Sequence, residues 1–74
     1  MVKGKVAILG LGYAGLSFAI AVASRGFKVI GIDIDERKVE LIRQGKLPFH
    51  EPGLKELLVK ALSDKLFKVT TEYH

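Results

Sequence analysis

The residues of this chain that could do chemistry are a group of glycines followed by one acidic residue. Positions 10–15 read Gly-Leu-Gly-Tyr-Ala-Gly, which is the spacing G-x-G-x-x-G, and Asp33 follows on a second apolar run. This spacing predicts a tight turn into a helix whose first N–H groups hold phosphate oxygens with help from the helix dipole. The chain has eight glycines, so a chance match is easy and the surrounding elements must decide.

Each position of the motif has a separate physical role. Gly10 permits the tight turn, and Gly12 lets a pyrophosphate approach the backbone. Gly15 allows the helix to lie close to the sheet. Asp33 is expected to accept hydrogen bonds from the adenosine ribose hydroxyls and to repel a 2′-phosphate, which favours NAD over NADP.

Neighbouring residues leave other interpretations open. Arg37 and Lys38 follow Asp33 closely enough to weaken the preference for NAD over NADP. FAD sites share the same glycine spacing. The alternative is that these residues bind no ligand: the glycines then only form a tight turn, and Asp33 only caps the next helix.

Alternating strands and helices surround the motif. Apolar runs rich in Val and Ile predict strands at residues 5–9, 27–33 and 66–71. Helical periodicity and capping residues predict helices at 13–25 and at 36–44. A third helix is predicted to begin with Pro52 at its first position. Its apolar stripe consists of Leu54, Leu57, Leu58, Ala61 and Leu62.

This alternation defines the fold class. Strands that alternate with helices pair in parallel through right-handed crossovers. We therefore predict a single α/β domain over residues 1–74. It is half of a doubly wound Rossmann fold, with element order β-α-β-α-α-β and three parallel strands in the order 3-2-1. The run at residues 5–9 is expected to be a strand of the type that is buried on both faces in parallel sheets.

Composition and charge exclude several other classes. The chain has 74 residues, 12 basic and 8 acidic side chains, no cysteine, and histidines only at His50 and His74. Disulfides and thiolate metal sites are therefore excluded, and we predict no metal site. The basic residues are scattered with acids between them, which indicates solvated helix faces and no nucleic-acid partner.

The uncharged stretch from Val6 to Ser24 has the outline of a signal peptide or a membrane span. Three glycines within about two turns would each cost ~1 kcal/mol relative to Ala in a spanning helix. Cleavage after Ala23 would leave about fifty residues with little to pack. We therefore expect a cytoplasmic protein with no membrane segment.

Two longer stretches are informative beyond the glycine motif. They read KVAILGLGYAGLSFAIAVASRGFKVIGIDIDERKVELI from Lys5 and GKLPFHEPGLKELL from Gly45. Together they resemble the N-terminal segment of the nucleotide-sugar 6-dehydrogenases, the UDP-glucose and UDP-N-acetylmannosamine dehydrogenases. The resemblance covers Lys5 to about Glu72, and the pattern G-x-x-P-x-x-E-P-G-L is its more specific part. It implies NAD as cofactor, bound at Gly10, Leu11, Gly12, Tyr13, Ala14, Gly15, Asp33 and Lys38.

The same resemblance implies what this chain does not carry. The family oxidises a sugar CH2OH twice, to a carboxylate, through a thiohemiacetal on an active-site cysteine far downstream of such a segment. No cysteine is present here, so we expect no catalytic residue. Two residues depart from the family pattern: Ala14 where a larger Val is usual, and Ser17 where Pro is common. Glu51 is interpreted as a helix cap.

Two functions from different classes stay open. The first is a fragment of an NAD-dependent UDP-sugar 6-dehydrogenase that binds the adenosine diphosphate half of NAD. The alternative is a designed or minimal half-Rossmann scaffold whose main property is self-assembly. A 3-2-1 sheet carries its helices on one face, which leaves a bare apolar face and an unpaired edge at the first strand. We therefore expect a homodimer or larger homo-oligomer through that face, that edge or both.

Overall fold

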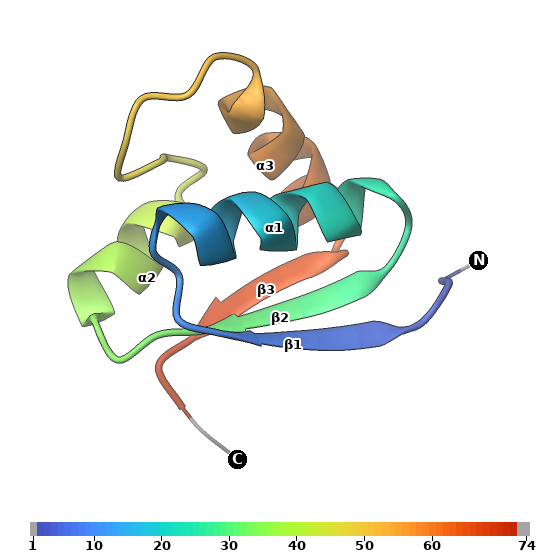
Figure 1. Ribbon diagram of the computed structural model, residues 1–74, viewed down its shortest axis with the longest axis horizontal. Helices are drawn as coiled ribbons and strands as arrows, with labels where there is room; N and C mark the ends of the chain where they lie inside the picture. The colour runs from blue at the N-terminus through green and yellow to red at the C-terminus, as the bar shows by residue number, and fades with distance from the viewer. Residues whose placement is uncertain (1, 73–74) are drawn as a thin grey trace.

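The computed structural model describes residues 2–72, which form a parallel sheet with helices packed on it (Figure 1). Along the chain the elements are β1 (Lys5–Leu9), α1 (Tyr13–Ser24), β2 (Lys28–Ile32), α2 (Glu36–Arg43), α3 (Leu54–Ser63) and β3 (Phe67–Thr70). The strands lie in the order β1-β2-β3, and both neighbouring pairs are parallel. The predicted half of a doubly wound sheet, with order 3-2-1, is confirmed.

The strand register brings the ends of β1 and β2 together. Leu9 at the end of β1 pairs with Ile32 at the end of β2. The amide of Gly10 donates to the carbonyl of Ile32 over 2.7 Å, which extends the ladder by one residue. Because parallel strands end at the same edge of a sheet, the glycine motif after β1 and Asp33 after β2 become neighbours.

The core lies between one face of the sheet and the three helices of the described chain, which all pack on that face (Figure 1). Its largest fully buried side chains are Phe67, Leu11, Leu16, Ile20, Ile42, Leu58, Val29 and Val39. Alanines at positions 19 and 23 bring α1 close to the strands. No helix within residues 2–72 is long and apolar enough to cross a membrane.

The prediction that the first strand is buried on both faces is wrong for this structure: the second face of the sheet has no helix over it, so burial of β1 is one-sided (Figure 1). We call this surface the bare face and define it by the exposed strand residues Lys5, Ala7, Leu9, Lys28, Ile30 and Lys68. Successive side chains of a strand point to opposite faces, which places these residues together opposite the core. Topology therefore leaves exposed an apolar strand face whose composition is suited to burial.

Two details of α3 differ from the sequence prediction. Pro52 is not its first residue, because the helix begins at Leu54 and Gly53 intervenes as N-cap with a left-handed φ of 83°. The predicted apolar stripe is only partly buried: Leu58 and Ala61 belong to the core, whereas Leu57 is 41% exposed. The N-cap role of Asp35 on α2 is confirmed, since its carboxylate accepts from the amides of Arg37 and Lys38.

Candidate functional site

The turn between β1 and α1 places three glycines in three different environments. Gly10 has a φ of 88°, which L side chains rarely adopt. A Cβ on Gly15 would lie 2.1 Å from the carbonyl oxygen of Gly10, so only glycine lets α1 start this close to β1. A Cβ on Gly12 would meet no atom within 4 Å. Nothing inside the protein therefore requires glycine at position 12, and its open side faces outward.

The start of α1 offers unpaired amide donors beside Gly12. Gly12 is the N-cap, and no side chain caps the helix or places an acidic group in its first turn. The amide of Leu16 makes the first intrahelical bond, to the carbonyl of Gly12 at 2.9 Å. The amides of Tyr13, Ala14 and Gly15 come before this bond and have no acceptor within the helix. Amides in this position, together with the helix dipole, attract anions such as phosphate.

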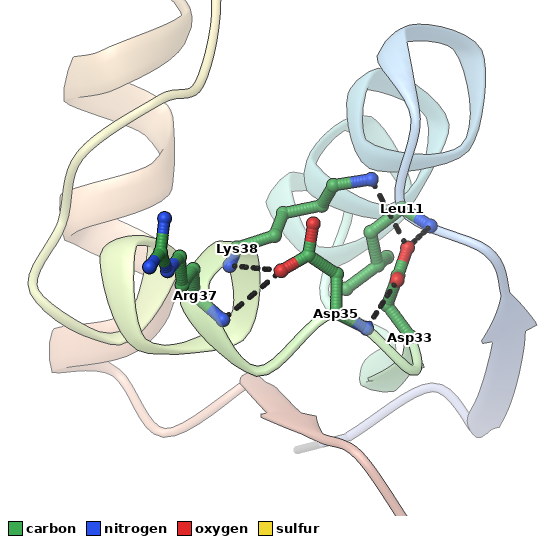
Figure 2. A network of polar contacts seen from close by, with 5 residues as sticks. All are labelled: Leu11, Asp33, Asp35, Arg37 and Lys38. Atoms are coloured by element: carbon green, nitrogen blue, oxygen red, sulfur yellow. Dashed lines mark hydrogen bonds and ion pairs between the residues drawn. The ribbon is translucent and has the colours of Figure 1, made fainter.

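The carboxylate of Asp33 accepts three hydrogen bonds, of which one comes from the glycine turn (Figure 2). Its Oδ2 accepts from the Leu11 amide at 2.8 Å and from Lys38 Nζ at 3.3 Å. Its Oδ1 accepts from the Asp35 amide at 2.9 Å. One carboxylate thus joins the glycine turn, the end of β2 and the beginning of α2.

The environment of Asp33 keeps it ionised. The amides of Asp35 and Leu11 lower the pKa of its carboxyl, and the Lys38 ammonium adds to this effect against the opposing effect of burial. A carboxylate has about four lone-pair positions, so three donors leave room for about one more. Asp33 is thus an ionised carboxylate, 8% exposed, that lies close to the start of α1.

A second cluster connects the turn with the loop before α3. The hydroxyl of Tyr13 donates to Glu51 Oε1 at 2.5 Å, and the rings of Tyr13 and Phe49 lie 4.9 Å apart with a 58° tilt. The hydrogen bond to Glu51 is the main reason that the pKa of Tyr13 is raised. The interpretation of Glu51 as a helix cap is wrong: its side chain caps nothing on α3, and only its backbone carbonyl accepts, from Leu54.

The structure brings all of the sequence-predicted site residues to one edge of the sheet. The turn carries Gly10, Leu11, Gly12, Tyr13, Ala14 and Gly15, Asp33 lies beneath it, and Lys38 reaches it from α2. Sequence reasoning did not foresee the contacts of Phe49 and Glu51 with Tyr13. The only available signal was the motif at 45–54, which indicates a family but does not predict which residues its side chains contact. Among the described residues, no group of three metal-ligating side chains occurs.

The chain matches a known family and its relatives in sequence. Residues 4–74 match the family described as the UDP-glucose/GDP-mannose dehydrogenase family, NAD binding domain. A GDP-mannose 6-dehydrogenase of Pseudomonas syringae pv. syringae is 44% identical over 69 residues, which cover 93% of this chain and 16% of that protein. A UDP-N-acetyl-D-mannosamine dehydrogenase of Methanococcus aeolicus is 48% identical over 68 residues, or 92% of this chain and 16% of that protein.

Solved structures agree with these matches. A UDP-N-acetyl-mannosamine dehydrogenase of Staphylococcus aureus superposes with a TM-score of 0.89 at 36% identity, over 95% of this chain and 17% of that one. A ternary complex of GDP-mannose dehydrogenase from Pseudomonas aeruginosa gives 0.87 at 42% identity, over 90% of this chain and 15% of that one. The chain thus spans about a sixth of these relatives. It belongs to the UDP-glucose/GDP-mannose dehydrogenase family and corresponds to part of its NAD-binding domain.

Proposed function

We propose that this chain binds the adenosine diphosphate half of NAD. The observation that carries the proposal is the uncapped start of α1 beside the anchored carboxylate of Asp33. The amides attract the pyrophosphate, and the carboxylate accepts from a ribose hydroxyl. The open side of Gly12 supports this assignment, because it is a place where a ligand could lie against the backbone without displacing protein atoms.

The individual residues would divide the work. The amides of Tyr13 and Ala14 face the phosphate oxygens, whereas the Leu11 amide is used within the protein to hold Asp33. The open acceptor position of Asp33 takes one ribose hydroxyl, and Lys38 can donate to a ribose oxygen from the other side. NAD supplies the hydride acceptor when bound; the chain's own residues bind and orient its adenosine end.

Preference for NAD over NADP follows from the charge of Asp33. Its carboxylate stays ionised and repels a 2′-phosphate. The ion pair with Lys38, at 3.3 Å, offsets part of that repulsion. We therefore propose a moderate preference for NAD, smaller than an unpaired Asp would give.

The parent activity we propose is NAD-dependent oxidation of a nucleotide-sugar hydroxymethyl group, as the names of the relatives suggest. This chain would contribute cofactor binding and no catalytic residue, because it contains no cysteine. We place the protein in the cytoplasm, which fits a chain free of disulfides.

Titration calorimetry of the 74-residue chain with ADP and with NAD tests the proposal. We expect dissociation constants within about threefold of each other, because the adenosine diphosphate half carries the affinity. Asp33→Asn should weaken both ligands by about tenfold, or about 1.4 kcal/mol. Asp64→Asn, which changes a distant acid paired with Lys60, should weaken neither. Binding of NAD much tighter than ADP, or no binding of either, would overturn the proposal.

A further inference from the structure

The α2–α3 loop, residues 44–53, is held in place mainly by its side chains. In the part of the chain that the structure describes, no backbone amide of residues 47–53 donates to another backbone group. Leu47 and Phe49 pack partly buried against the core, whereas the end of the loop borders an open hollow between α1 and α3. The position of the loop beside α1 therefore depends on a few side-chain contacts.

Two of these contacts converge on one residue of the glycine turn. The hydroxyl of Tyr13 donates to Glu51 Oε1 at 2.5 Å, and the ring of Tyr13 lies 4.9 Å from the ring of Phe49. Both partners belong to the loop, whereas Tyr13 is the first residue of α1. Glu51 is also the acidic residue of the motif at 45–54, and cofactor binding as described above gives that motif no role. The structure connects the two motifs of the sequence through this one tyrosine.

The backbone and the side chain of Tyr13 face different partners. Its amide is one of the donors at the start of α1 that have no acceptor within the helix. Its side chain is fixed at the far end by a hydrogen bond to the loop. Because the amide and the side chain share one Cα, fixing the ring restricts the orientation of the amide. Groups that touch a ligand bind it more tightly when such a second layer of contacts holds them.

Gly12 lies between two residues that are each held by a carboxylate. On one side, Asp33 accepts from the amide of Leu11 at 2.8 Å. On the other side, Glu51 accepts from the hydroxyl of Tyr13. A Cβ on Gly12 would meet no atom within 4 Å, so packing does not fix this position itself. The two neighbours of Gly12 therefore set the orientation of the backbone at the place where a phosphate would approach.

We propose that Tyr13 is a positioning residue for the cofactor turn, and that Glu51 acts through it to couple the α2–α3 loop to ligand binding. The inference rests on the proposed binding of adenosine diphosphate. A carboxylate near phosphates repels them, so Glu51 favours binding through its hydrogen bond and not through its charge. Coupling between two sites is reciprocal. A ligand that fixes the amide of Tyr13 therefore also stabilises the loop.

Titration calorimetry with ADP tests the positioning role. Tyr13→Phe removes only the hydroxyl and should weaken ADP binding about fivefold. In a Glu51→Ala background the same change should have no effect, because the hydroxyl has already lost its partner. Glu56→Ala is the matched control background, since Glu56 is an exposed glutamate in the first turn of α3. In that background the effect of Tyr13→Phe should remain.

The outcomes separate this inference from the proposed function. No binding of ADP by the wild type overturns the proposed function and this inference with it. Wild-type affinity in Tyr13→Phe overturns this inference alone. An equal loss of affinity in the Glu51→Ala background shows that the hydroxyl acts without Glu51, which also overturns it.

Amide NMR spectra test the coupling, which a merely structural role of Tyr13 would not produce. ADP should shift the resonances of the turn, residues 10–16, and also those of residues 49–51 in the loop. In Tyr13→Phe saturated with ADP, the turn should still shift, whereas the loop should shift much less. Equal urea midpoints without ADP show that both proteins are equally folded. Equal loop shifts in the two proteins would overturn the coupling through Tyr13.

Discussion

Gly12 and Gly15 differ by only three positions, yet alanine should affect them in opposite ways. At Gly12 a new methyl group would meet no protein atom within 4 Å, and the φ of −70° suits any residue. The remaining effect on folding is that of a poorer N-cap, at most about 1 kcal/mol. A pyrophosphate lying against this backbone would meet the methyl group directly. We expect Gly12→Ala to weaken ADP binding at least about tenfold, or 1.4 kcal/mol.

Gly15→Ala is the matched control with the reverse outcome. Its methyl group would lie 2.1 Å from the carbonyl oxygen and 3.2 Å from the carbonyl carbon of Gly10. These are backbone atoms, so α1 must shift away from β1. Overpacking of this kind costs about 1–3 kcal/mol, and the helix preference of alanine returns ~1 kcal/mol. Because the clash is with backbone atoms, we expect the upper end of this cost. The net loss is then about 2 kcal/mol, against the ~3–5 kcal/mol that a core of this size supplies.

The assay combines urea denaturation followed by circular dichroism with titration calorimetry for ADP, at one fixed protein concentration. Gly12→Ala should unfold near the wild-type midpoint and bind poorly, whereas Gly15→Ala should unfold at lower urea. Wild-type affinity in Gly12→Ala would refute the placement of the phosphates. Wild-type stability in Gly15→Ala would refute the described contact between α1 and the turn.

Three further outcomes are expected. The folded-state pKa of Asp33 lies below its ordinary value of 3.8, so its contribution to stability is complete above that value and is lost as pH falls through the folded-state pKa. Asp33→Asn should therefore reduce the loss of stability at acid pH, measured as the unfolding midpoint against pH. An unchanged loss at acid pH would contradict the lowered pKa of Asp33. Glu51→Gln should lower the pKa of Tyr13 toward 10.0. Tyrosinate absorbance measures this pKa when Tyr73 is replaced by Phe, so that Tyr13 is the only tyrosine that titrates. An unchanged pKa of Tyr13 would show that Glu51 is not its hydrogen-bond partner. The purified chain should produce no NADH from NAD with UDP- or GDP-sugars, since it lacks a cysteine nucleophile; protein-dependent NADH formation would contradict this.

Features that depend on neighbours in sequence were predictable. The glycine spacing, the Asp35 cap and the strand order all follow from local patterns and crossover handedness. The position of Asp33 at the end of β2 also follows, because parallel strands end at one edge. The shared edge alone therefore predicts that Asp33 lies beside the glycine turn.

Features that depend on the packing of helices were not predictable. The bond between Tyr13 and Glu51 joins residues 38 positions apart and requires the loop before α3 to pass over α1. The contact of Arg43 with Val69 similarly depends on where α2 lies over the edge of β3. Periodicity shows which face of a helix is apolar, but it does not give the crossing angle or the lateral position of that helix.

The Leu11 amide gives the chain a built-in spectroscopic probe. Leu11 is fully buried, and its N–H donates to the carboxylate that joins the turn to β2 and α2. A buried and hydrogen-bonded N–H exchanges with solvent only when its surroundings open, so we expect hydrogen exchange at Leu11 to report how stably the turn is held. The same hydrogen bonds hold the turn in place before any ligand arrives, which lowers the cost of ordering it on binding.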